Sequence, residues 1–153
     1  MGTRREGREA AIQYLYQLDL NERELNASQD DFWGLRTSST NNKPSAKLRV
    51  FAEQIVAGVA AHIEDIDGRI KQYAANYELH RIAAVDRNIL RVAIYEMLFC
   101  PDVPPVVSIN EAIEIAKRFG SEESGRFVNG ILDRVRAELP RPAREPVKPG
   151  KGE

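Results

Sequence analysis

The chain has few of the residues on which disulfide, metal and enzyme chemistry depend. Its 153 residues include one cysteine, Cys100, and two histidines, His62 and His80. A single thiol excludes an internal disulfide and a thiolate metal cluster. The histidines stand in no HExxH motif, and nothing resembles a nucleophile elbow, a P-loop or a dinucleotide-binding glycine motif. The sequence therefore predicts no catalytic residue, no metal and no cofactor.

Long apolar runs and an excess of positive charge are also missing. No run reaches the roughly 18 apolar residues that a membrane span needs. The opening MGTRREGREA has no apolar signal core behind it, so we expect a cytoplasmic protein. The formal net charge is −1. Because proteins bind phosphates largely through Lys and Arg, any binding of nucleic acid must use a local basic patch, or a partner that supplies more charge.

The residues that are present favour helices, because Val, Ile and Leu recur at helical spacing and not in strand-like alternation. One apolar stripe predicts a helix over 3–20, and a second predicts one long helix or two collinear ones over 48–77. We expect bends at Gly58 and Gly68. The polar stretch 26–47 predicts a long loop with a short turn around Phe32 and Trp33. We expect Trp33 to pin this loop to the core, and an exposed ligand platform is the alternative.

The C-terminal half predicts three more helices. Residues 85–99 are apolar nearly all round, which is typical of a central buried helix, and Glu96 on its most apolar face needs a structural partner. After a proline-rich stop, Ser108–Glu111 reads as a capping box and Gly120 as a left-handed helix stop. Ser121 is the expected cap of the last helix.

These segments together predict an all-α bundle of six to seven helices. We expect one domain over 1–139, with 26–47 as a polar loop insertion. The remainder, 140–153, is rich in Pro, Lys and Arg and is expected to be disordered.

Arginines at the start of the first helix are a candidate binding surface. Arg4 and Arg8 share an azimuth with the apolar stripe at Ala11 and Leu15. Since we expect that arginines cannot follow that stripe into a core, the first turns should overhang it and leave the guanidiniums free. Free arginines suit RNA phosphates and base edges. A solvated helix terminus is the alternative.

Two further features suit nucleic-acid binding. Phe127 lies at the edge of the last helix's apolar stripe and Arg126 lies outside it, an arrangement that suits stacking of an unpaired base. A core-rim position is the alternative for Phe127. Arg87 and Arg91, four residues apart, form a second basic strip, for which solvated charge is the alternative.

Three segments resemble the NusB family. The opening RREGREAAIQYLYQLDL resembles its arginine-rich first helix, and AVDRNILRVAIYEML resembles its central helix. The run VPPVVSINEAIEIAKRFGSEESGRFVNGILDRV resembles its signature from the proline turn to the last helix. The resemblance covers roughly 3–25 and 48–138, and its last run is long and specific.

The resemblance implies a fold of two small antiparallel helical bundles and a role in transcription antitermination, notably of ribosomal RNA operons. It implies a heterodimer with the small-subunit ribosomal protein NusE. That pair would bind the boxA element of nascent RNA and join other Nus factors on RNA polymerase. The implied mechanism is recognition and tethering, without a chemical step.

The family's RNA surface and partner surface can be carried over by position. The implied RNA-binding residues are Arg4, Arg5, Arg8, Tyr16, Arg87, Arg126 and Phe127. The implied partner-interface residues are Asp86 and Glu123. Glu6 and Gly7 interrupt the arginine run, which we expect to weaken RNA contact from this arm.

Other functions stay open at this point. A helical protein–protein adaptor without RNA binding is the main alternative. A module that serves an RNA-modifying enzyme in trans is a second, although the sequence has no strand–helix cofactor motif. Exposed apolar surface on a helical protein would also be compatible with a homodimer.

Overall fold

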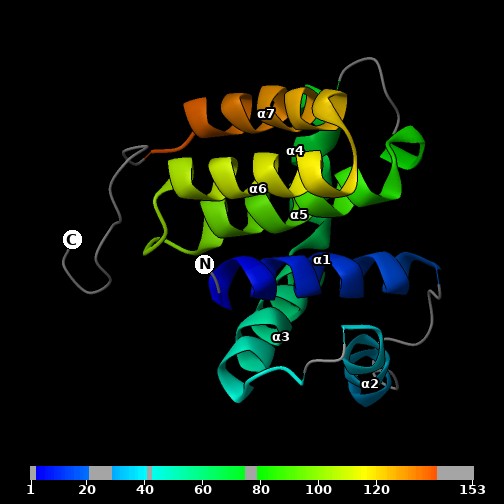
Figure 1. Ribbon diagram of the computed structural model, residues 1–153. Helices are drawn as coiled ribbons and strands as arrows, with labels where there is room; N and C mark the ends of the chain where they lie inside the picture. The colour runs from blue at the N-terminus through cyan, green and yellow to red at the C-terminus, as the bar shows by residue number, and fades with distance from the viewer. Residues whose placement is uncertain (1–2, 21–28, 41–42, 75–78, 141–153) are drawn as a thin grey trace. The chain divides into compact units, whose positions relative to one another are not determined.

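The structure is a computed structural model that describes residues 3–20, 29–40, 43–74 and 79–140. These residues form seven α-helices and one short 3₁₀ helix, η1, without a strand among them (Figure 1). The helices are α1 Thr3–Leu20, α2 Gln29–Thr40, α3 Ala46–Ala61, α4 Ile63–Tyr73, η1 Leu79–Arg81, α5 Ala84–Phe99, α6 Pro105–Phe119 and α7 Glu122–Ala137. The predicted all-α class is confirmed. None of the helices in these ranges combines the length and hydropathy of a membrane-spanning segment.

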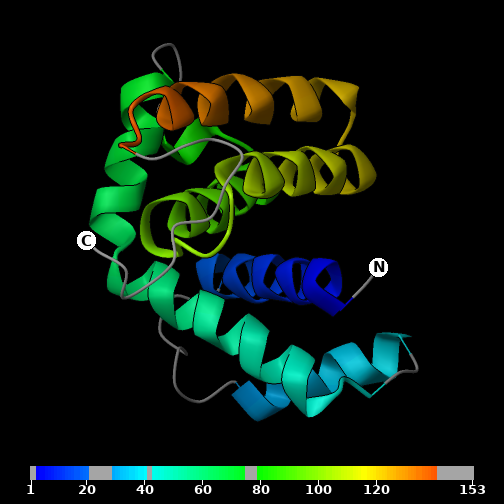
Figure 2. The same cartoon turned by 90° about the vertical axis from the view of Figure 1, so that its left-hand side faces the viewer.

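The chain divides into two compact units, Met1–Ala57 and Gly58–Glu153, with the boundary inside α3. The first unit holds α1, α2 and most of α3. The second unit holds α4 to α7, in which α5, α6 and α7 pack against one another and α4 packs against α5 and α7 (Figure 2). The predicted tail, 140–153, lies outside the described residues except for Pro140.

Helix α2 occupies the segment for which we predicted a polar loop, and that prediction is wrong. Phe32 and Trp33 are 5% and 3% exposed. The Phe32 ring stacks on Tyr14 of α1 with 4.5 Å between ring centroids. The indole Nε1 of Trp33 donates a hydrogen bond of 2.8 Å to Glu53. Two adjacent aromatics therefore give a polar segment one buried side, and packing decides its conformation.

The core of the second unit consists of aliphatic side chains from four helices. Each stabilises the fold by about 1.5–3 kcal/mol when fully buried. The largest fully buried hydrophobic residues in it are Ile66, Ile70, Ile89, Leu90, Ile94, Met97, Ile115 and Leu132.

The predicted bends at Gly58 and Gly68 are wrong, because the helices break at His62, between α3 and α4. Gly58 has a different purpose: a Cβ at that position would lie 2.3 Å from the ring of Tyr95, so only glycine lets this ring pack against α3. A Cβ on Gly68 would meet nothing within 4 Å. The His62 ring stacks on Phe99 of α5, with 3.9 Å between centroids.

The proposed capping box is also wrong. Because α6 begins at Pro105, a residue suited to a first helical position, Ser108 already lies inside the helix. Its hydroxyl donates a hydrogen bond of 2.9 Å to Oε1 of Glu96, which is 2% exposed. The prediction that Glu96 has a structural partner is thereby confirmed.

The boundary between α6 and α7 lies where it was predicted. Helix α6 ends at Phe119 with Gly120 as its C-cap, so the predicted position of the stop is confirmed, whereas the φ of −122° at Gly120 shows that the predicted left-handed conformation is wrong. Ser121 caps α7 as predicted, because its hydroxyl oxygen accepts a hydrogen bond of 3.1 Å from the backbone N–H of Ser124.

Candidate nucleic-acid interface

The arginine-rich start of α1 is built around an aromatic ring of α3. The guanidinium carbons of Arg4 and Arg8 lie 5.3 Å and 5.8 Å from the ring centroid of Phe51. Both distances suit a cation–π contact. A Cβ on Gly7 would lie 2.4 Å from this ring. Gly7, which we had treated as an interruption of the arginine run, is therefore what lets the ring approach the helix.

The three arginines differ in exposure. Arg4 and Arg5 are exposed, whereas Arg8 is only 5% exposed. The expectation that the first turns leave these guanidiniums free is wrong, because Arg8 is buried and the guanidinium of Arg4 also lies against the Phe51 ring. The methylene stem of Arg8 can be buried while its planar, weakly hydrated guanidinium faces an aromatic ring. Arg4 and Arg5 thus present the accessible charge of this arm.

Tyr16 stands further along α1 with 38% of its surface exposed. It lines a pocket of about 360 Å³ that lies wholly within the first unit. The other lining residues are Gln13, Gln17, Leu20, Phe32, Leu35 and Arg36. Sequence reasoning missed this pocket because its second wall is α2, for which a loop was predicted.

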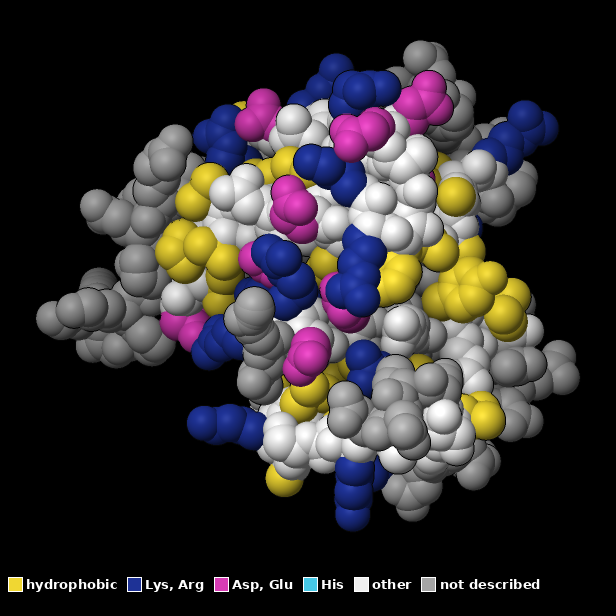
Figure 3. Space-filling view, in the orientation of Figure 1, with side chains coloured by type: hydrophobic (Ala, Val, Ile, Leu, Met, Phe, Trp, Pro, Cys, Tyr) yellow, Lys and Arg dark blue, Asp and Glu magenta, His cyan; other side chains and the backbone are white. Residues whose placement is uncertain are grey.

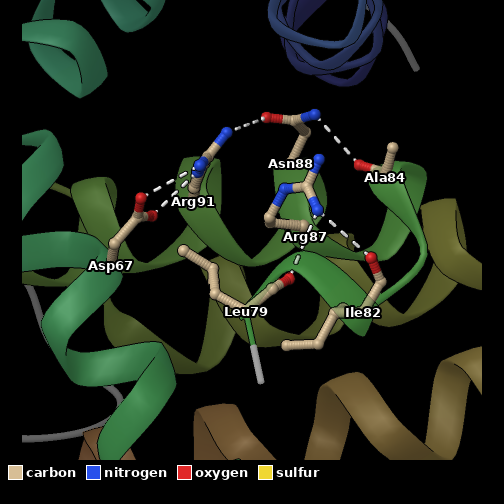
Figure 4. A network of polar contacts seen from close by, with 7 residues as sticks. All are labelled: Asp67, Leu79, Ile82, Ala84, Arg87, Asn88 and Arg91. Atoms are coloured by element: carbon tan, nitrogen blue, oxygen red, sulfur yellow. Dashed lines mark hydrogen bonds and ion pairs between the residues drawn. The ribbon is translucent and has the colours of Figure 1, made fainter. Parts of the chain in front are cut away.

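Arg87 and Arg91 do not form a basic strip, and that prediction is wrong (Figure 4). Arg91 is 8% exposed. Its Nε and one terminal nitrogen donate to the two carboxylate oxygens of Asp67 at 2.8 and 2.9 Å. Its other terminal nitrogen donates to Asn88 at 3.0 Å. The alternative of solvated charge is equally wrong for this residue.

Arg87 supports the chain segment that precedes α5. One of its terminal nitrogens donates to the carbonyl oxygens of Leu79 and Ile82, at 3.3 and 3.2 Å (Figure 4). The side chain is half-buried. These bonds hold η1 against the start of α5 and so fix the residues that follow it.

The segment held by Arg87 forms one wall of a pocket of about 390 Å³ in the second unit. Its lining residues are Arg81, Ile82, Ala83, Asp86, Ser121, Glu123, Ser124 and Phe127. The structure thus brings together Phe127 with Asp86 and Glu123. Arg126 is exposed on α7 and does not line the pocket. Arg81, an exposed cation in the wall, was not singled out from the sequence.

Asp86 is the most buried charged group of this pocket, with 9% of its surface exposed. Burial raises the pKa of its carboxyl above the ordinary value, and a hydrogen bond from Ser124 opposes that rise. The hydroxyl of Ser124 donates to Oδ2 at 3.3 Å. Because Asp86 lies in the first turn of α5, the helix dipole also favours its charged form.

The outer face of α6 and α7 carries mixed charge. In Figure 3, Lys and Arg side chains and Asp and Glu side chains lie interspersed over these two helices. This agrees with the net charge of −1. Binding of nucleic acid on this face would therefore have to depend on particular side chains and not on a broad positive surface.

Comparison with known proteins identifies relatives that match about nine-tenths of the chain. Residues 5–137 match the NusB family. The transcription antitermination protein NusB of Myxococcus xanthus is 44% identical over 142 residues, which are 93% of this chain and 100% of the relative. That of Desulfatibacillum aliphaticivorans is 45% identical over 139 residues, 91% of this chain and 93% of the relative.

Solved structures share the fold. The structure of T. maritima NusB has a TM-score of 0.76 and 37% identity, and the match covers 90% of this chain and 93% of the other. A chain from the crystal structure of the antitermination factors NusB and NusE in complex with dsRNA has a TM-score of 0.75 and 27% identity, with 91% and 99% covered.

Proposed function

The chain belongs to the NusB family of transcription antitermination proteins, and we propose that it acts by binding boxA RNA as a heterodimer with NusE. The pair joins other Nus factors on RNA polymerase and tethers the nascent ribosomal RNA transcript. The protein works in the cytoplasm, where transcripts are made. The family assignment also confirms the prediction that the chain is not an enzyme.

One observation carries the proposal: Phe127 lies in a single pocket with Asp86 and Glu123. An accessible aromatic ring suits stacking of an unpaired base. The adjacent carboxylates suit a basic partner protein, because opposite charges steer association. A related NusB chain occurs in a crystal structure with NusE and dsRNA, which supports the proposal that one protein binds both RNA and NusE.

The first unit contributes a second group of contacts in this proposal. Arg4 and Arg5 bind phosphates, and Tyr16 stacks on a base. Arg8 supports this group of contacts indirectly, because its guanidinium and that of Arg4 both lie against the Phe51 ring. The net charge of −1 makes the NusE requirement physically reasonable, because phosphate binding needs more positive charge than this chain supplies alone.

The second unit divides its roles between contact and support. Arg126 binds phosphate beside Phe127. Arg87 supports binding by holding the pocket wall through Leu79 and Ile82. Asp86 and Glu123 face NusE.

Analytical ultracentrifugation tests the proposal with labelled boxA RNA, this protein and NusE. We expect a complex of one copy of each protein that carries the RNA. Phe127→Ala should retain NusE and lose RNA affinity by about 1–3 kcal/mol. The matched control is Phe119→Ala, which removes a 43% exposed ring from the end of α6, in the same unit. Equal RNA binding by both variants would contradict the stacking role.

The adaptor without RNA binding makes the opposite prediction. It expects the NusE complex to form and the labelled RNA to sediment freely in every mixture. Such a result would replace the RNA proposal with a purely protein-binding role.

A further inference from the structure

The pocket in the first unit has the composition of a ligand site. Gln13 stands three and four residues before Tyr16 and Gln17, and Leu20 stands four and three residues after them, so the four side chains lie on one side of α1. Helix α2 supplies the opposite wall. The volume of about 360 Å³ falls in the range of roughly 300–1,000 Å³ that is typical of small-ligand sites.

The wall from α2 is held by contacts behind it. Phe32 stacks on Tyr14 at 4.5 Å and meets Trp33 edge-on at 5.1 Å. Trp33 is in turn hydrogen-bonded to Glu53. A wall fixed in this way keeps its shape before a ligand arrives, which lowers the entropic cost of binding.

The rim of the pocket leaves large apolar groups in water. Tyr16, Leu20 and Leu35 are 38%, 64% and 63% exposed. Single exposed apolar side chains are ordinary, but three around one pocket indicate a surface that a flat, partly apolar group can cover.

Hydrogen-bonding groups stand between these apolar side chains. The Nε of Arg36 donates to Oε1 of Gln13 at 3.0 Å. This bond orients the Gln13 amide, whose nitrogen keeps its donor capacity. Gln17, one turn later, brings a second amide. The pocket lining contains a guanidinium and no carboxylate.

We propose that this pocket binds one unpaired nucleobase of the RNA, with Tyr16 and Leu35 covering its faces and Gln13 and Gln17 bonding its edge. This inference rests on the proposed function, in which Tyr16 stacks on a base, and adds to it the residues that enclose that base and bond its edge. Glutamine amides can pair with donor–acceptor base edges, and single-stranded bases stack on aromatic and guanidinium groups.

A nucleobase fits this pocket better than the apolar face of a partner helix. An apolar face would cover the Gln17 amide without offering it a hydrogen bond, which costs free energy. The exposed Arg4 lies twelve residues before Tyr16 on α1, about 18 Å along the axis. One short RNA strand can therefore contact the arginine arm and the pocket together.

The test measures boxA RNA affinity by fluorescence anisotropy with the full chain and NusE. Gln17→Leu removes the amide at similar size, and Gln54→Leu is the control, on an exposed position of α3 away from the pocket. We expect Gln17→Leu to bind about 3- to 10-fold more weakly, the effect of about one hydrogen bond. Gln54→Leu should bind like the unaltered protein. Unchanged thermal midpoints show that both variants fold.

A second arm uses RNAs that each lack one base. At a single position the missing base should weaken binding by the unaltered protein and leave Gln17→Leu almost unaffected. If Gln17→Leu and Leu35→Ser bind as tightly as the unaltered protein while Phe127→Ala weakens binding, the base pocket is refuted and the proposed function stands. Loss of NusE binding by Gln17→Leu would show a protein-docking site and overturn the inference. If no variant binds RNA, both proposals fail.

Discussion

The ion pair between Arg91 and Asp67 allows a direct measurement of the stability that this fold loses when a buried charge loses its partner. The two residues meet through paired hydrogen bonds of 2.8 and 2.9 Å. The side chain of Arg91 is 10% exposed and that of Asp67 is 15% exposed. A bidentate guanidinium–carboxylate pair is among the stronger polar contacts in proteins. Its low exposure means that water cannot readily replace a lost partner.

Asp67→Ala removes the carboxylate and leaves a positive charge in a site that is nearly closed to water. Breaking a buried pair from one side costs about 3–5 kcal/mol. Because some exposure remains, we expect about 3 kcal/mol. For a chain of this size that loss lowers the melting temperature by roughly 6–12 °C.

Urea denaturation of paired variants checks this magnitude. The control is Asp133→Ala, because Asp133 and Arg136 also meet at 2.8 Å, but with side chains that are 62% and 36% exposed. That surface pair should contribute about 0.2–1 kcal/mol. The double variant Asp67→Leu with Arg91→Met should recover much of the lost stability. Equal losses for Asp67→Ala and Asp133→Ala would refute the reasoning from burial.

Two further predictions follow from close packing and from titration. Gly7→Ala should destabilise the protein by about 1–3 kcal/mol, because the added Cβ would lie 2.4 Å from Phe51. The control is Gly34→Ala, whose added Cβ would meet nothing within 4 Å and which should stabilise the protein by up to about 1 kcal/mol. Thermal denaturation of both variants checks these changes. Asp86→Asn should stabilise the fold at pH 7, because burial raises the pKa of Asp86. Because the pKa of Asp86 is higher in the folded protein than in the unfolded chain, this residue stabilises the fold fully only at pH values below its unfolded pKa of about 3.9. That stabilisation is lost as the pH rises through the folded pKa. The advantage of Asp86→Asn should therefore vanish in acid, and an equal advantage at pH 3 and pH 7 would contradict this cause.

The sequence pattern was sufficient where one physical effect dominates. The first helix follows from its apolar stripe, and the structure places it at Thr3–Leu20, as expected. The buried central helix follows from its apolar surface, and Glu96 has the partner that a buried carboxylate requires. The edge position of Phe127 also follows from helical geometry, and its side chain is half-buried.

The sequence pattern gave wrong predictions where a residue distant in the sequence determines the local structure. Arg8 follows the apolar stripe because Phe51, more than forty positions away, supplies a ring for its guanidinium. The helix at Gln29–Thr40 depends on the packing of Phe32 and Trp33, which a polar composition conceals. Ser108 has the spacing of a cap but bonds across to Glu96. Local propensity cannot reveal such tertiary partners.

The most direct test of the account is competition for a labelled boxA RNA bound to this protein together with NusE, at fixed salt. Unlabelled boxA RNA and a scrambled strand of equal length serve as the two competitors. The account predicts that boxA displaces the label at far lower concentration, and that neither protein alone shows this preference. Equal displacement by both strands would contradict sequence-selective recognition by the pair.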